Sequence, residues 1–244
     1  MADTPADTPA DTPMDLSKTD KHWNFSYYQE ADAAERIIAV HICAYSDRAD
    51  INLARLRRNS DHDPVFDSDD ERNAIRFHND NFEIPRDVPN HWALILELRN
   101  REGRGVKVEM APSWQPGRPA REGTVLVSSL AAGWRTRESI VKSVRFVVVS
   151  PAATTTVQQV LENVSHNARH RYLFTEGGEG SRYWVHTVIR DLEMVEMLHD
   201  GVADTAEEVM SMIWSRDGDA VATRLRRGMF TEWTIRGEKK KGFW

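Results

Sequence analysis

Three residues whose side chains together can transfer an acyl group are spread along the 244-residue chain. His91 begins an apolar, strand-like run, Glu109 lies in a second such run, and Ser181 follows the glycine-rich stretch 177–180 at the start of a helix-like segment. Acyl transfer needs a nucleophile, a base within hydrogen-bond reach and a group that orients the base. A helix N-terminus helps, because its dipole and free N–H groups stabilise negative charge. The three residues are therefore candidates for one acyl-transfer site, with Glu109 orienting the imidazole.

Each of these residues also has a purely structural interpretation. A histidine in a strand commonly packs in the core, glycines before a helix commonly form a loop, and Ser181 suits an N-cap. The segment also departs from the nucleophile elbow of hydrolases, because Tyr183 stands where that motif has its second glycine. Spacing alone therefore leaves both interpretations open.

Two other groups of reactive side chains are interpreted as non-catalytic. His41 and Cys43 are two residues apart, so they share one face of a predicted strand. No glycine turn or helix start exposes the Cys43 thiol, and we interpret both residues as core. The stretch 61–63 mixes aspartate and histidine but lacks the glycine and terminal glutamate of an EF-hand loop. We therefore expect neither a metal nor a cofactor.

The apolar periodicity of the chain predicts an antiparallel sheet with helices packed on it. Period-two or continuous β-branched runs predict strands, and apolar residues three or four apart predict helices. The runs 91–98 and 105–110 form a hairpin across the charged turn 99–104. Further strands are predicted at 36–44, 123–129 and 142–149, and helices at 154–164, 181–199 and 204–227. Strands followed by a segregated group of helices give an α+β domain.

Composition predicts a soluble chain with one folded domain, residues 22–244. The leader 1–21 contains three Ala-Asp-Thr-Pro repeats, which cannot form a packed core, and is predicted to be disordered. A long polar insertion, with one basic helical piece at 49–58, is expected near 47–89. The single cysteine excludes an intrachain disulfide, and no apolar run reaches the roughly 20 residues of a bilayer span. No secretory signal is expected either, so the chain is predicted to be cytoplasmic.

The three candidate residues lie within the motifs H-W-A-L (91–94), V-E-M-A-P (108–112) and G-S-R-Y-W-V (180–185). This order resembles the permuted papain-like proteins related to lecithin retinol acyltransferase, in which a cysteine nucleophile begins a helix. The resemblance implies that His91 is the base, Glu109 the orienting residue and Ser181 the residue in the nucleophile position. Over roughly 37–198 the chain also resembles uncharacterised fungal proteins with N-H-W and G-C-R-[FY]-W motifs.

The chain departs from the papain-like pattern at two of these positions. Ser181 stands where the cysteine belongs, and Glu109 where histidine is commoner. A hydroxyl is far less acidic than a thiol, so a site built for a thiolate would lose most of its reactivity. Ser181 is then the nucleophile of a serine enzyme, a mark of an inactive relative that only binds, or a replacement that traps a ligand.

Three functions are consistent with these residues. The first is an acyl-transfer enzyme of fungal secondary metabolism that forms or cleaves an amide or ester of a small molecule. The second is a cyclodipeptide-type synthase that takes its acyl group from aminoacyl-tRNA, which the basic stretch 224–241 would contact. The third is an inactive protein that binds a ligand in an apolar groove. Candidate substrate-binding residues beside the site are Asn90, Trp92, Glu179, Arg182 and Trp184, and no membrane partner is expected.

Overall fold

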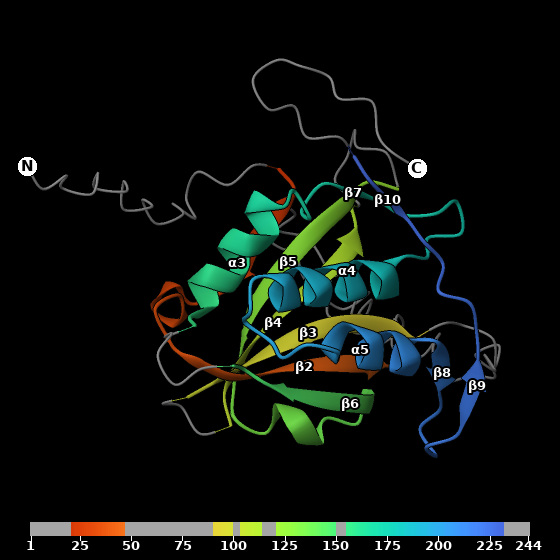
Figure 1. Cartoon of the computed structure of the whole chain (residues 1–244), viewed down its shortest axis with the longest axis horizontal. Helices are drawn as coiled ribbons and strands as arrows, with labels where there is room; N and C mark the ends of the chain where they lie inside the picture. The colour runs from red at the N-terminus through yellow and green to blue at the C-terminus, as the bar shows by residue number, and fades with distance from the viewer. Residues whose placement is uncertain (1–20, 47–89, 100–102, 114–120, 150–154, 232–244) are drawn as a thin grey trace, which may run out of the picture.

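A six-stranded sheet with helices on one face forms the body of the protein (Figure 1). The structure is a computed structural model that describes residues 21–46, 90–99, 103–113, 121–149 and 155–231. The strands are β1 (Trp23–Tyr27), β2 (Ile37–Tyr45), β3 (His91–Leu98), β4 (Gly105–Pro112), β5 (Gly123–Leu130) and β6 (Ile140–Val147). Their order is β1-β5-β4-β3-β2-β6, and all neighbours are antiparallel except β1 and β5. The predicted α+β class and its mainly antiparallel sheet are confirmed.

Alternation along β3 separates the two faces of the sheet. Trp92, Leu94 and Leu96 belong to the main core, which includes the apolar residues of the helices. Ala93 and Ile95 belong to a second apolar cluster on the other face, where Trp134 from the short turn of helix η3 (Trp134–Thr136) covers them. Because successive side chains of a strand point to opposite faces, odd-numbered residues of β3 face away from the helices.

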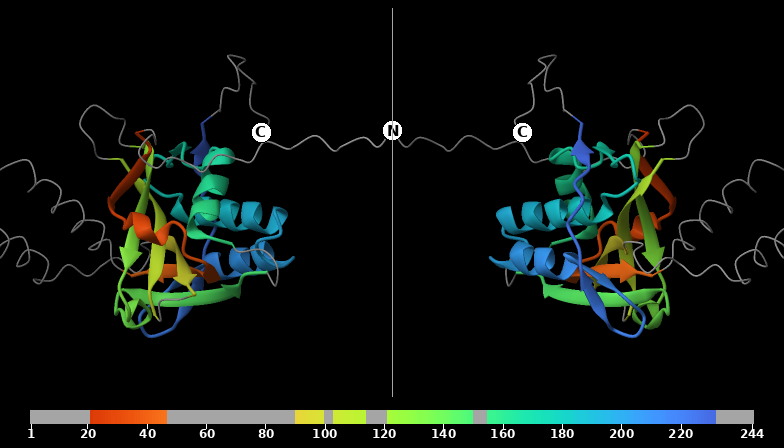
Figure 2. Two further views of the ribbon diagram at one scale, coloured as in Figure 1. Left: turned by 90° about the vertical axis from the view of Figure 1, so that its left-hand side faces the viewer. Right: turned by 90° about the vertical axis from the view of Figure 1, so that its right-hand side faces the viewer.

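The three α-helices lie together on one side of the sheet, as the perpendicular views make clear (Figure 2). They are α3 (Val157–His166), α4 (Ser181–Met194) and α5 (Val202–Met210). Thr156 and Gln159 form a capping box at the start of α3, whose apolar stripe is buried as the sequence predicted. Helix α4 contacts β3 and β4 directly, so it packs on the two central strands of the sheet.

The sequence-based prediction is wrong in the last third of the chain. The predicted helix 204–227 ends at Met210, and a hairpin of β8 (Met212–Trp214) and β9 (Ala220–Ala222) follows. Gly218 lies between these strands with φ of 87°, a left-handed conformation that a helix does not contain. The helix predicted to reach 199 ends at Met194, because the chain turns before Gly201.

A pair of two-residue strands, far apart in the sequence, completes the fold. β10 (Met229–Phe230) pairs antiparallel with β7 (Tyr172–Leu173), beside the start of α4. Strand β1 was not predicted. The leader, the insertion 47–89 with its helical piece, and residues 232–244 lie outside the described residues. Within the described part of the chain, no helix is long and apolar enough to cross a membrane.

Candidate active site

His91 and Glu109 are joined by a hydrogen bond across the gap between two strands. The ladder between β3 and β4 runs from Glu97↔Gly105 to Leu94↔Val108 and stops before the first residues of β3. Beyond that point the side chains connect the strands: His91 Nε2 lies 2.9 Å from Glu109 Oε2. The structure therefore brings together the base and the orienting carboxylate that the sequence suggested.

The charge of Glu109 determines which ring nitrogen of His91 donates to it. Burial alone would raise the pKa of Glu109, but the Lys107 ammonium and His91 outweigh it and lower the pKa to about 2. Lys107 Nζ is 2.6 Å from Oε1, so both carboxylate oxygens accept a bond. An ionised carboxylate can only accept, so His91 donates from Nε2, which leaves the lone pair of the neutral ring on Nδ1. Nδ1 is the atom that can act as a base.

Ser181 is brought to the same end of β3 by the start of α4. Its Oγ lies 3.4 Å from the backbone N of Trp92, the residue after His91, and accepts a hydrogen bond from it. Gly180 makes the turn into the helix with φ of 144°, and a Cβ there would lie 2.6 Å from the Tyr172 hydroxyl. Glycine is thus required both by the backbone and by the close approach of Tyr172.

The hydroxyl contacts the backbone of β3 and not the imidazole. Among the described residues, Ser181 and His91 share no hydrogen bond. Alternation along β3 directs His91 toward the face without helices, whereas α4 packs on the opposite face. Proton transfer from Ser181 to His91 therefore requires a closer approach than this structure contains. Hydrogen bonds of an active site commonly tighten only when substrate is bound.

Three of the candidate substrate-binding residues have structural roles, because their side chains bond to the backbone or pack in the core. Asn90 accepts from the backbone N of Trp214 at 2.6 Å and donates to its carbonyl at 2.9 Å, so it attaches β8 to the start of β3. Trp92 and Trp184 are fully buried in the main core. Trp184 also donates its indole N–H to the Arg169 carbonyl. These side chains hold the elements around the site; the two tryptophans have no exposed surface, and Asn90 is only 7% exposed.

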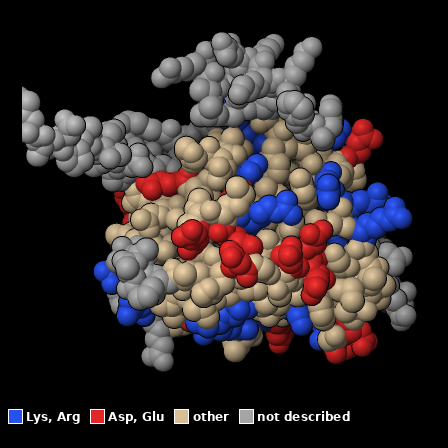
Figure 3. Space-filling view, viewed as in Figure 1, with Lys and Arg blue, Asp and Glu red and all other residues tan. Residues whose placement is uncertain are grey.

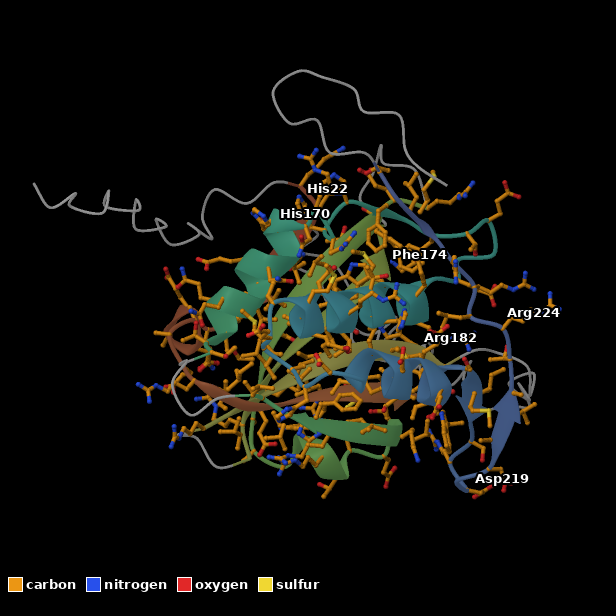
Figure 4. The ribbon with its side chains drawn as sticks, in the orientation of Figure 1. His22, His170, Phe174, Arg182, Asp219 and Arg224 are labelled. Carbon is orange, nitrogen blue, oxygen red and sulfur yellow. The ribbon has the colours of Figure 1, made fainter. Side chains whose placement is uncertain are left out.

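Arg182 and Glu179 flank the first turn of α4. Arg182 is buried beside α5 and donates to the carbonyl of Met210, the last residue of that helix (Figure 4). Glu179 is partly exposed, and its carboxylate lies 3.5 Å from the Arg226 guanidinium. Among the five predicted substrate-binding residues, Glu179 is the most exposed, and it precedes the start of α4.

A second histidine–carboxylate pair, which the sequence analysis had not identified, lies on the same outer face of the sheet. His41 Nε2 is 2.9 Å from Glu97 Oε2. His41 is buried, as the sequence predicts for a core residue, but against a carboxylate and a hydroxyl. The signal available in the sequence was Glu97 itself, a charge within an otherwise apolar strand. No group of three metal-ligating side chains occurs among the described residues.

The basic stretch 224–241 is described only as far as residue 231, so its contact with tRNA stays a prediction. On the face that carries the helices, acidic and basic side chains lie intermingled (Figure 3).

The fold and the site define an α+β protein in which a partly buried imidazole–carboxylate pair and a serine at a helix N-terminus lie at the same end of one strand. Residues 75–231 match the model of a family described as "Domain of unknown function (DUF7770)". The chain belongs to this family. Comparison with curated proteins and with solved structures gave no significant match.

Proposed function

We propose that the protein is an acyl-transfer enzyme in which Ser181 is the nucleophile, His91 the base and Glu109 the residue that positions the base. One observation supports the proposal: the His91–Glu109 bond and the Ser181 hydroxyl lie at the same end of β3, although on opposite faces of the strand, where the β3–β4 ladder has ended. We further propose that the domain is a permuted papain-like fold, since a helix that begins at the nucleophile packs on the strand carrying the histidine.

The proposed reaction uses the groups found at this strand end. Ser181 Oγ attacks the acyl carbon, its proton passes to His91 Nδ1, and the leaving group departs with that proton. The acyl-serine then reacts with an amine, an alcohol or water, whose proton returns through His91. The first bond within α4 runs from Trp184 N to the Gly180 carbonyl, so the preceding amide groups are free to stabilise the oxyanion.

A serine in this position requires a reactive acyl donor. The hydroxyl remains protonated without a base, unlike the thiolate of papain-like enzymes. Thioesters and activated esters of small molecules, such as those used in fungal secondary metabolism, are therefore the proposed donors. Glu179, partly exposed at the start of α4, is the residue we assign to a cationic or hydrogen-bonding part of the acceptor.

Variants at Ser181 test the proposal with a panel of acyl thioesters and small amines. Ser181→Ala should lower acyl transfer to the amines by at least about 1,000-fold, because this site then has no nucleophile. Ser181→Cys should keep or raise the rate. Thr205→Ala, which removes an exposed hydroxyl of α5, is the matched control and should retain full activity. Unchanged turnover in Ser181→Ala would exclude acyl transfer at this site.

The contact between Ser181 and the strand backbone favours one second candidate function, an inactive protein that binds a ligand on the same fold. In that protein Ser181 only fixes α4 on β3 through the Trp92 amide. Binding of a small molecule without turnover, undiminished in Ser181→Ala and in His91→Gln, would support this second function.

A further inference from the structure

Ser143, His41 and Glu97 form a continuous chain of hydrogen bonds on the outer face of the sheet. Ser143 Oγ lies 3.4 Å from His41 Nδ1, and His41 Nε2 lies 2.9 Å from Glu97 Oε2. The three residues come from three adjacent strands, β6, β2 and β3. Their order is that of a nucleophile, a base and the carboxylate that orients the base.

The exposure of the three side chains follows the same order. Ser143 is exposed on β6, the last strand of the sheet, whereas His41 and Glu97 are 4% and 8% exposed. The Trp134 indole packs edge-on against the His41 ring at 5.0 Å and helps to hold it in place. A substrate can therefore reach the hydroxyl, while the base behind it is fixed and shielded from water.

Charges around the chain favour a neutral imidazole beside an ionised carboxylate. Burial lowers the pKa of His41, and this effect outweighs the opposing influence of Glu97. Burial would raise the pKa of Glu97, but the bonds from Arg135, His41 and Arg145 lower it to about 2. The Glu97 carboxylate accepts the Nε2–H of His41, and the Nδ1 lone pair is left for the Ser143 proton.

Cys43 does not compete with Ser143 as the nucleophile. Its thiol is fully buried and lies 3.4 Å from Ser143 Oγ, to which it donates. Burial raises the pKa of the thiol to about 12, so the reactive thiolate is absent at neutral pH. The thiol donates to the Ser143 oxygen, and the serine proton remains directed at His41.

Two arginines give the surroundings of this chain a positive charge. Arg135 NH2 and Arg145 Nε contact the Glu97 carboxylate at 2.5 and 3.0 Å, and both side chains are nearly half exposed. Arg145 is two residues from Ser143 on β6 and lies on the same face. Two guanidinium groups against one carboxylate leave a net positive charge next to the exposed hydroxyl, which suits an anionic substrate.

We propose that Ser143 is a second nucleophile of this protein and that it accepts the acyl group of small esters whose acyl part carries a carboxylate. Ser143 Oγ attacks the ester carbonyl, and its proton passes to His41 Nδ1. The bond to the alcohol oxygen breaks, and the alcohol leaves with the proton from His41. Water then attacks the acyl-serine, gives a proton to His41 and releases the acid, while the Ser143 oxygen recovers that proton.

The full-length protein with 4-nitrophenyl succinate tests this site, with 4-nitrophenyl acetate as the neutral comparison. We expect nitrophenolate release and a succinyl ester on the peptide containing Ser143, identified by mass spectrometry. Alkaline hydroxylamine should remove this ester but not any lysine amide. Ser143→Ala should lower the release about 100-fold. Arg145→Gln should reduce the preference for succinate over acetate about threefold.

Ser26 supplies the matched control, because it is an exposed serine on β1, the strand at the opposite edge of the sheet. Ser26→Ala should leave both the release and the Ser143 ester unchanged. Equal labelling of Ser26 and Ser143, or unchanged release in Ser143→Ala, would overturn the proposal. The Ser181→Ala protein separates the two sites, since it should keep the Ser143 ester whether or not Ser181 transfers acyl groups.

Discussion

The two histidine–glutamate pairs of the sheet contain the same kind of hydrogen bond, but different side chains surround them. His41–Glu97 and His91–Glu109 both join Nε2 to Oε2 at 2.9 Å, and both lie on the face away from the helices. In the first pair, Ser143 is hydrogen-bonded to Nδ1 of His41, and two guanidinium groups form ion pairs with the Glu97 carboxylate. In the second, one ammonium meets the carboxylate, and Nδ1 has no hydrogen-bond partner among the described residues.

This difference separates the role of the carboxylate from the role of the nucleophile. In both pairs an ionised glutamate fixes the same tautomer, so the orientation of the imidazole does not distinguish them. What distinguishes them is the position of the nearest hydroxyl. Ser143 is already bonded to its histidine and exposed, whereas Ser181 is buried and bonded to a backbone amide. We expect Ser143 to react with small esters directly, and Ser181 only when a bound substrate draws it toward His91.

Acid should weaken both histidine–glutamate pairs, and we expect this to be the largest effect on the stability of the protein. The pKa values of Glu97 and Glu109 are lowered to about 2 in the folded protein, against an ordinary value of 4.5. Their stabilisation is complete above about pH 4.5 and is lost as pH falls toward about 2, because the unfolded chain then binds more protons. Each carboxylate should contribute roughly 3 kcal/mol to the free energy of unfolding.

Urea unfolding between about pH 5 and 2 measures this loss. Glu97→Gln and Glu109→Gln should each remove part of the pH dependence. Added salt should reduce the contribution of Glu97 to the free energy of unfolding more than that of Glu109. The reason is that Arg135 and Arg145 are nearly half exposed, whereas Lys107 is largely buried. A pH dependence that neither substitution changes would show that these pairs do not control acid stability.

Asn90→Ala should affect the surroundings of His91 and leave the His41 pair intact. The substitution removes both bonds to the Trp214 backbone, at a cost of about 2 kcal/mol, since two partly buried backbone groups lose their partner. Hydrogen exchange should then increase in β8, at the start of β3 and, because Asn90 also donates to the Tyr45 carbonyl, at the end of β2, but not around His41 or in β6. Uniformly faster exchange across the sheet would mean that Asn90 supports the whole fold and not this strand end alone.

Five strands of the main sheet, β2 to β6, and one histidine–glutamate pair could be predicted from the sequence, for reasons that do not extend to the other pair. Alternation predicted β3 and β4, and a hairpin brings His91 and Glu109 together within 18 residues of sequence. Glu97 and His41 are 56 residues apart, and Ser143 and His41 are 102 apart, so only the order and register of the strands join them. Neither property follows from local periodicity.

The end of α5 was mispredicted for a different reason. The apolar spacing after Met210 fits a helix as well as a strand over a few residues, and the hairpin is decided by tertiary contacts. Asn90 holds β8 through the backbone of Trp214, and Lys142 of β6 lies 4.0 Å from the centre of the Trp214 ring. Packing of this kind overrides a short helical pattern.

Removing each serine hydroxyl should give the smallest effect and the clearest contrast between the two pairs. Ser143→Ala should lower the free energy of unfolding by about 0.5 kcal/mol, because water can replace an exposed hydroxyl. Ser181→Ala should cost about 1 kcal/mol or more, because the buried Trp92 amide loses its acceptor. Thermal or urea unfolding of the two variants beside wild type measures both values. The reverse order would mean that Ser143 is chiefly a structural link between β6 and β2, whereas the expected order leaves Ser143 free to serve as a nucleophile at little cost in stability.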